Sequence, residues 1–376
     1  MKGVEGVSEF ALALRERLNN NQPLVVYHKP GDKVIRAWFP DEVELNPEEH
    51  EVSPGFVFSP FDHRSPTALF PLHASEIRET SVEGIHHLRN DENSPGLLNR
   101  RVQTGPEKER EPDLYHSSKI GHQDLVSKTI RFIQSGQATK IVISRKEKIN
   151  VEHLDPIGVF GTLVEKYPEA FAYLWYHPGI GIWTGASPEM LLSIQEGDFR
   201  TMSLAATRLW NEEQQPAWEE KELEEQRLVT QMIEKELGDQ LIGVGEPFNQ
   251  RAGHLVHLRT DIEGHIKPGS HPRDIIRKLH PTAAICGMPR ERAREFLLEN
   301  EGYSREYYTG YLGELMGPDN RDTNLFVNLR CMKLTPEENS AWIFVGGGIT
   351  RASQVDKEWE ETVVKSQTMK GIFLEK

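Results

Sequence analysis

The sequence has little cysteine and no long apolar stretch. Its 376 residues include only two cysteines, Cys286 and Cys331, which excludes a disulfide framework and a zinc site built from cysteines. One bridge between them is arithmetically possible, but two reduced thiols in a reducing compartment are the favoured interpretation. No stretch approaches the ~18 apolar residues of a membrane-spanning helix. Charged residues interrupt residues 1–20, so no signal peptide is expected. These absences predict a soluble, cytoplasmic protein with no membrane partner.

Basic residues are outnumbered by acidic ones. Lys and Arg number 44 against 58 Asp and Glu, which gives a formal net charge of −14. A protein that binds the phosphate backbone of a nucleic acid needs a basic face, so no nucleic-acid partner is expected. A small anionic ligand requires a site that is locally basic or that holds a cation. The length favours one large domain or two ordinary ones.

The most polar stretch, residues 89–112, predicts a long loop that interrupts the fold. The residues before this loop look poor in strands and broken by prolines. The loop could be a domain linker, but we assign residues 1–115 to an N-terminal part of the same fold, and residues 116–376 to its main part, which the resemblance described below identifies as the catalytic core.

Apolar spacing after residue 116 predicts a series of helices and strands. Helices are expected at 120–135, 218–237 and 355–373. Strands are expected at 140–144, 171–176, 181–184, 191–194, 199–205, 326–334 and 342–346. The strands come in antiparallel-looking runs with few strand–helix–strand alternations, which predicts an α+β fold.

Two of these helices carry carboxylates on their apolar faces. Glu225 lies in the middle of one apolar stripe and Glu222 borders it, and Glu361 and Glu358 are placed similarly on the last helix. Ionised carboxylates that face a core need a cationic partner. Two such helices facing each other would offer several oxygen ligands to a hard cation such as Mg²⁺. Pattern alone favours the alternative, in which both pairs lie at the solvent edge beside Lys or Arg.

Three further features could carry chemistry. Lys140 opens an apolar strand, where a desolvated lysine could act as a base, although a strand-end lysine that reaches water is commoner. Gly346, Gly347 and Gly348 follow a strand and could offer backbone amides to a carboxylate, the alternative being a tight bulge. His257 is a lone histidine, for which a structural role is the more frequent outcome.

Nine short motifs, taken in order, resemble those of the chorismate-utilising enzymes, a family of isochorismate, salicylate, anthranilate and aminodeoxychorismate synthases. Each motif alone is weakly specific, but the ordered set, which runs from about residue 120 to the C-terminus, is highly specific. The motifs are KIVISR (140–145), GASPE (185–189), SLAATR (203–208), KELEEQ (221–226), VHL (256–258), LHPT (279–282), YTG (308–310), GGGI (346–349) and EWEET (358–362).

The resemblance implies a single chorismate-binding α+β domain, in which two antiparallel sheets pack together and helices cover the outside. It also implies a cofactor. Glu225 and Glu361 match the family's Mg²⁺ ligands, with Glu222 and Glu358 close to them. The cation would meet the ring carboxylate of chorismate, which answers the electrostatic difficulty of an acidic protein that binds an anion.

The resemblance assigns roles around the substrate as well. Lys140 matches a lysine that activates water, Glu189 matches a general acid, and His257 matches a histidine beside the ring. The residues expected to bind the substrate, several of them through its carboxylates, are Ala206, Thr207, Ala284, Ile285, Tyr308, Arg330, Gly346, Gly347, Gly348 and Lys365.

Residue identity favours the isochorismate synthases within this family. Lys140 resembles the lysine of the water-using members, whereas the ammonia-using anthranilate synthases usually have Gln. Ala205 stands where aminodeoxychorismate synthases carry a lysine. Ala284 and Ile285 resemble the isochorismate synthases, since salicylate synthases tend to have a Thr-containing segment there. No obligatory glutaminase subunit is therefore expected.

The expected reaction is Mg²⁺-dependent addition of water at ring C2 of chorismate with loss of the C4 hydroxyl. The product could serve menaquinone or siderophore biosynthesis. Two alternatives stay open. One is a salicylate synthase, which also eliminates pyruvate. The other is a catalytically silent chorismate-binding homologue, because Ala206 stands where the family usually has glycine.

Overall fold

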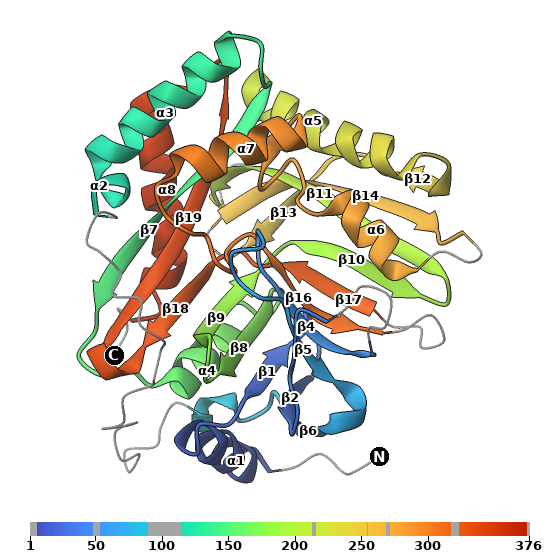
Figure 1. Cartoon of the computed structure of the whole chain (residues 1–376), viewed down its shortest axis with the longest axis vertical. Helices are drawn as coiled ribbons and strands as arrows, with labels where there is room; N and C mark the ends of the chain where they lie inside the picture. The colour runs from blue at the N-terminus through green and yellow to red at the C-terminus, as the bar shows by residue number, and fades with distance from the viewer. Residues whose placement is uncertain are drawn as a thin grey trace.

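Two antiparallel sheets organise the chain, as expected for this α+β fold (Figure 1). The computed structural model describes residues 6–47, 53–88, 114–212, 216–253, 255–267, 271–316 and 323–373. The predicted loop 89–112 lies outside the described residues.

The first sheet has nine strands, and each pairs with its neighbour in antiparallel register. In sheet order they are β15 (Gly287–Met288), β7 (Lys140–Asn150), β19 (Ser340–Thr350), β18 (Cys331–Thr335), β9 (Gly181–Ser187), β8 (Phe171–His177), β1 (Leu24–His28), β2 (Val34–Pro40) and β6 (Ser75–Ser81). The long pair of β7 and β19, beside the short edge strand β15, carries several of the predicted site residues.

The second sheet has ten strands. In sheet order they are β12 (Leu241–Val244), β14 (Leu255–His265), β11 (Asp198–Leu209), β10 (Met190–Gln195), β17 (Thr323–Val327), β16 (Tyr311–Leu315), β4 (Gly55–Ser59), β5 (Ala68–Pro71) and β3 (Glu44–Leu45), with β13 (Phe248–Ala252) also paired to β14.

Aromatic side chains fill the space between the two sheets. Phe58 of β4 stacks on Tyr307 with ring centroids 4.2 Å apart and packs against Trp175 of β8 at 4.7 Å. Phe171 of β8 stacks on Phe326 of β17 at 4.3 Å. Large rings from alternate strand positions bury much apolar area and prefer offset or tilted pairs. This core holds the two sheets face to face.

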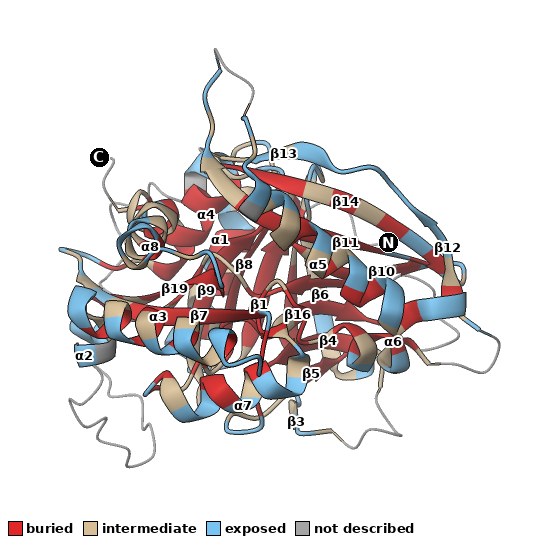
Figure 2. Cartoon of the chain, turned by 90° about the horizontal axis from the view of Figure 1, so that it is seen from above, coloured by how far each residue is buried: buried red, intermediate tan, exposed pale blue. Residues whose placement is uncertain are grey.

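Helices cover the sheets on their outer sides, so that the strands are mostly buried and the outward helix faces are exposed (Figure 2). The helices are α1 (Val7–Asn19), α2 (Leu114–Ser117), α3 (Lys119–Gln134), α4 (Pro156–Lys166), α5 (Glu220–Leu237), α6 (Pro272–Leu279), α7 (Arg290–Asn300) and α8 (Val355–Lys370). Helix α5 packs on β11 and α8 packs on β19. Within the described residues, no helix is both long and apolar enough to cross a membrane.

The N-terminal residues are richer in strands than the sequence suggested. Strands β1, β2 and β6 join the nine-stranded sheet, whereas β3, β4 and β5 join the other. The interpretation of this region as strand-poor is wrong. Three of them, β1, β4 and β5, are short and buried on both faces, so they lack the apolar–polar alternation by which a strand is recognised.

The predicted single strand 326–334 is also wrong, because the chain changes sheets within it. Val327 ends β17 in the ten-stranded sheet and Cys331 starts β18 in the other. At the crossing, the buried side chain of Asn328 accepts a hydrogen bond from Tyr173 (2.7 Å) and donates one to the Tyr307 carbonyl (2.9 Å). No glycine or proline marks this crossing, so the apolar run reads as one continuous strand.

Candidate active site

The predicted site residues gather around one cavity with about 780 Å³ of empty space, its opening to solvent included. The predicted residues that line it are Glu189, Ala206, Thr207, Glu225, His257, Ala284, Ile285, Tyr308, Arg330, Gly346, Gly347, Gly348 and Lys365. Lys140, Glu222, Glu358 and Glu361 lie beyond this lining.

The three glycines lie inside β19, so the prediction that they follow a strand is wrong. Gly346 and Gly348 pair with residues of β7 in an unbroken ladder. A Cβ on Gly348 would lie 2.5 Å from Glu225 Oε1 and 2.9 Å from Lys140 Cε. Glycine is needed here because two charged side chains lie directly against the strand backbone.

Lys140 and Glu225 form an ion pair beside this strand. Lys140 is fully buried, and its Nζ lies 2.9 Å from Glu225 Oε1. Lys140 belongs to β7 and Glu225 to α5, so the contact joins a strand of one sheet to a helix that covers the other. The expectation that Lys140 reaches water at the strand end does not hold.

Helix α8 places two more carboxylates beside Gly347, the neighbour of Gly348 in β19. A Cβ on Gly347 would lie 3.5 Å from Glu361 Oε1 and 3.8 Å from Glu358 Oε2. Glu358 is 1% exposed, and Glu361 Oε1 lies 2.6 Å from Lys365 Nζ. Carboxylates of both helices therefore lie against adjacent glycines of β19. The pattern alone favoured the solvent edge beside Lys or Arg. Glu225 and Glu361 do have a lysine partner, but the solvent-edge position is wrong for the buried Glu358.

The carboxylates suit a hard cation without forming a closed site. Magnesium is usually held by one or two protein carboxylates, with waters and ligand oxygens completing its shell. Among the residues that the structure describes, no group of three His, Cys, Asp or Glu side chains is arranged to hold a metal ion. The carboxylate oxygens of Glu225 and Glu361 lie next to Gly348 and Gly347, which have no side chains. They suit an ion whose remaining ligands come from water and from a substrate.

Glu222 is engaged elsewhere. Its carboxylate accepts two hydrogen bonds from Arg208, at 2.6 and 2.7 Å, and one from the backbone N–H of Glu219 at 2.7 Å. The last contact is half of a capping box at the start of α5. Glu222 would have to leave Arg208 to reach a cation near Glu225.

Glu189 lies buried between β9 and β10 with 3% of its surface exposed. Its backbone N–H donates to Ser187 Oγ at 3.3 Å, and its carbonyl accepts from the Val327 N–H at 3.0 Å. Burial raises the pKa of Glu189 to about 8, an effect that the Lys140 ammonium opposes. The carboxyl is therefore mostly protonated at neutral pH, which is the state that a general acid needs.

His257 faces the cavity from β14 as a neutral ring. Burial, together with the positive charges of Arg330 and Lys365, lowers the pKa of His257 to about 3. Its Nδ1 lies 2.9 Å from the Ala206 carbonyl, so Nδ1–H donates there and Nε2 keeps its lone pair. Nε2 faces Arg330 Nη2 at 3.5 Å. This arrangement suits a hydrogen-bond partner and not a proton donor.

Two cationic side chains, Arg330 and Lys365, bring positive charge to the cavity. Arg330 lies at the crossing between β17 and β18 with φ +47°, and its Nη1 donates to Thr368 Oγ1 at 3.0 Å. Burial lowers the pKa of Arg330 to about 10, so the side chain stays charged at neutral pH. Lys365 Nζ donates to the Gly346 carbonyl at 3.1 Å. These groups can attract a small dicarboxylate into an acidic protein.

Ala206 has a left-handed backbone conformation, with φ +57°. It lies where the pairing of β11 with β14 changes register between Ala205 and Arg208, which marks a bulge. A residue with a Cβ is disfavoured at this φ, whereas glycine is not. The structure therefore gives a physical reason why glycine suits this position.

Replacing Ala206 with glycine is expected to raise the free energy of unfolding by about 1 kcal/mol, because the strain of a left-handed alanine exceeds the added flexibility of the unfolded chain. Denaturant unfolding measures the change. Ala205→Gly is the matched control, since Ala205 is equally buried but has ordinary strand geometry. This control is expected to lose about 0.5–1 kcal/mol. Equal losses in both variants would contradict the strain.

Several cavity residues were not predicted. They include Leu329, Phe344, Met369 and Thr309. Phe344 could have been found, because it alternates with Gly346 and Gly348 along β19 and so shares their face. Leu329 belongs to the sheet crossing that the sequence did not reveal.

A family model described as chorismate binding enzyme matches residues 44–371, which extends the resemblance well before residue 120. Anthranilate synthase component 1 of Aquifex aeolicus is 25% identical over 69% of this chain and 55% of its own length. Isochorismate synthase EntC of Escherichia coli is 28% identical over 67% of this chain and 66% of its own length. The aligned part thus spans between half and two thirds of these relatives.

Solved structures agree in fold. The crystal structure of DhbC from Bacillus anthracis, a proposed 2,3-dihydroxybenzoate-specific isochorismate synthase, has a TM-score of 0.74 at 20% identity, with 95% of this chain and 99% of that chain covered. MenF of Escherichia coli has a TM-score of 0.73 at 19% identity over 96% and 91% of the two chains. At this identity the match concerns the fold.

Proposed function

The chain belongs to the chorismate binding enzyme family, and from this we propose that it acts as an isochorismate synthase. The observation that carries the proposal is a buried carboxyl that lines the cavity, Glu189, whose pKa burial raises to about 8 and which feels the charge of the buried Lys140. Water addition at one ring carbon with loss of a hydroxyl at another needs one group that takes a proton and one that gives a proton. These two residues supply that pair.

The proposed reaction moves two protons. Lys140 forms an ion pair with Glu225 in the structure, and its amine has to lose a proton before it can act as the base. It then takes a proton from the water that attacks ring C2 of chorismate. The ring double bonds shift, and Glu189 gives its proton to the C4 hydroxyl, which leaves as water. One water enters and one leaves, so the product is an isomer of the substrate. Ala284, Ile285, Thr207 and His257 line the ring, and Arg330, Lys365 and Tyr308 bind its carboxylates.

Mg²⁺ is part of the proposal. Glu225 and Glu361 would hold it, with Glu358 beside them and Glu222 joining only if it releases Arg208. The chemistry that the ion supplies when bound is neutralisation of the ring carboxylate of chorismate. Because water and not ammonia is the proposed nucleophile, no glutaminase subunit is part of the proposal.

Removing the metal is expected to abolish turnover. Activity should disappear in excess EDTA and return with added Mg²⁺, because the acidic α5 and α8 face the ring carboxylate without a counter-charge. Glu361→Gln should raise the Mg²⁺ concentration that gives half-maximal activity by more than about tenfold. Glu360→Gln, at an exposed position of the same helix, is the matched control. Full activity of the wild-type protein in EDTA would refute the metal proposal.

Product analysis tests the function. The wild-type protein is incubated with chorismate and Mg²⁺, with and without ammonium, and the products are separated by chromatography. Isochorismate alone is the expected result. Salicylate with pyruvate would identify a salicylate synthase, and ammonium-dependent anthranilate would identify the activity named for the Aquifex relative. Binding of chorismate without turnover would identify a silent homologue, which the strained Ala206 makes worth testing.

A further inference from the structure

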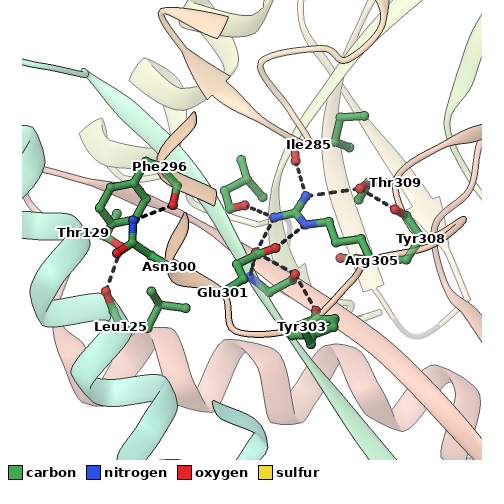
Figure 3. Close-up of polar contacts among 12 residues, drawn as sticks. Leu125, Thr129, Ile285, Phe296, Asn300, Glu301, Tyr303, Arg305, Tyr308 and Thr309 are labelled. Carbon is green, nitrogen blue, oxygen red and sulfur yellow. Dashed lines mark hydrogen bonds and ion pairs between the residues drawn. The ribbon is translucent and has the colours of Figure 1, made fainter. Parts of the chain in front are cut away.

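A buried ion pair, Glu301 with Arg305, lies directly after the end of α7 (Figure 3). Arg305 is 0% exposed and Glu301 is 2% exposed. Neither side chain lines the cavity, and neither belongs to the residues predicted from the sequence. A fully buried arginine in such a place must satisfy five N–H donors within the protein.

All five donors of Arg305 have partners. Nε donates to Glu301 Oε2 at 2.7 Å, and Nη2 donates to Glu301 Oε1 and to the Val142 carbonyl, the latter at 2.6 Å. Nη1 donates to the Ile285 carbonyl at 2.9 Å and to Thr309 Oγ1 at 3.1 Å. No donor is left to meet a substrate, so Arg305 is not a substrate-binding residue.

Glu301 extends the contacts to β7. Its Oε1 accepts from the backbone N–H and from the hydroxyl of Ser144, each at 2.8 Å. The Ser144 hydroxyl lies 2.7 Å from the hydroxyl of Tyr303. Ser144 pairs with Gly346 in the β7–β19 ladder, so the network reaches the strand that carries the three glycines.

The residues that the pair holds come from three separate segments of the cavity wall. Val142 lies on β7, Ile285 follows α6, and Thr309 follows Tyr308, and all three line the cavity. The guanidinium also lies between two rings, 4.5 Å from the centroid of Phe61 and 5.9 Å from that of Tyr308. A planar fork with fixed donor directions sets the relative positions of the groups that it binds.

We propose that the Glu301–Arg305 pair positions the substrate-binding wall of the cavity, by holding β7, the Ile285 segment and the Tyr308 turn in one mutual arrangement. The proposal rests on the proposed function only in taking chorismate as the ligand. Buried ion pairs contribute little net stability compared with apolar replacements. The consequence of this pair is therefore expected in substrate affinity, because small displacements of binding groups cost much in productive binding.

Glu301→Gln tests the proposal, since it keeps the shape of the side chain and removes its charge. We expect the KM for chorismate to rise about tenfold, with a smaller change in kcat, when assayed well below the unfolding temperature of the variant. Glu314→Gln is the matched control. Glu314 is also a buried carboxylate, bonded to Tyr27 and to Lys29 (2.6 Å), but its partners lie away from the cavity. The control should lose thermal stability and keep its KM.

Ser144→Ala covers the case in which Glu301→Gln does not fold. It removes the hydroxyl bonds to Glu301 and Tyr303 and keeps the backbone N–H bond, so KM should rise about two- to fivefold. Ser340→Ala, at the far end of β19, is its control. An unchanged KM in a folded Glu301 or Ser144 variant would overturn the proposal. Product identity in the wild-type protein tests the proposed function separately, because the KM for chorismate, or its Kd if there is no turnover, can be compared between variants whatever the product is.

Discussion

Replacing Glu189 with glutamine is expected to lower kcat for chorismate conversion by about 10²–10⁴-fold, the usual effect of removing a general acid. Glutamine keeps the size and the hydrogen-bonding groups of the buried side chain, but it has no proton to give to the departing C4 hydroxyl. Steady-state kinetics on the purified variant measures the loss, and thermal unfolding checks that the fold persists. Glu196→Gln, at an exposed turn between β10 and β11, is the control and should have wild-type activity.

The pH dependence follows from the same side chain. The pKa of Glu189 is raised from its ordinary 4.5 to about 8, so the proton-donating form is present below about pH 8 and is lost above it. The value of kcat/KM for the wild-type protein should therefore fall on the alkaline side with an apparent pKa near 8, since this parameter reports the free enzyme. Activity that persists unchanged up to pH 10, or a Glu189→Gln variant with wild-type turnover, would exclude Glu189 as the acid.

Replacing Lys140 with methionine is expected to cause a loss of similar size, about 10²–10⁴-fold in kcat. Methionine fills the buried volume and removes the amine that would take a proton from the attacking water. Lys148→Met is the matched control on the same strand. Lys148 lies at the exposed end of β7, where it pairs with Glu338 at 2.7 Å. Residual turnover above a tenth of the wild-type value in a folded Lys140 variant would rule out the base.

The result for the Lys140 variant also depends on Glu225, because the two side chains form an ion pair. The amine and the carboxylate lie 2.9 Å apart, with Lys140 fully buried and Glu225 partly exposed, so removal of Lys140 leaves a partly buried carboxylate without that partner. Loss of one member of a fully buried pair destabilises a protein by about 3–5 kcal/mol, and the loss here is expected to be smaller. Unfolding measurements in the presence of Mg²⁺ should therefore accompany the kinetics, because a cation held by Glu225 would compensate for part of this loss.

Much of the fold could be predicted from local patterns. The helices α3, α5 and α8 begin and end within a few residues of their predicted limits, because apolar spacing of 3.6 residues and the flanking cap residues are local signals. The strands β8 and β9 follow from short runs rich in apolar and aromatic residues, and the hairpin of β10 and β11 follows from two such runs joined by the Glu196–Gly197 turn. The α+β class follows from their order.

The structural predictions that were wrong concern features that depend on tertiary contacts. The crossing at residues 328–330 and the N-terminal strands depend on which sheet each segment joins, and that choice is made by contacts between residues far apart in sequence. The three glycines were placed outside a strand because glycine is rare within strands. Here the strand keeps glycine so that Glu225 and Lys140 can lie against its backbone.

Local sequence patterns were enough to predict the class of the fold, the acidic balance and the presence of carboxylates on the apolar faces of two long helices, although those patterns favoured a position at the solvent edge for them. Only the tertiary structure decided what these residues meet. It placed Glu225 beside Lys140, gave Glu222 to Arg208, buried Glu189 deeply enough to keep its proton, and bound three segments of the cavity wall to Arg305. The physical reason is range: periodicity and capping act over a few residues, whereas burial, ion pairing and pKa arise from neighbours that only the folded chain brings together.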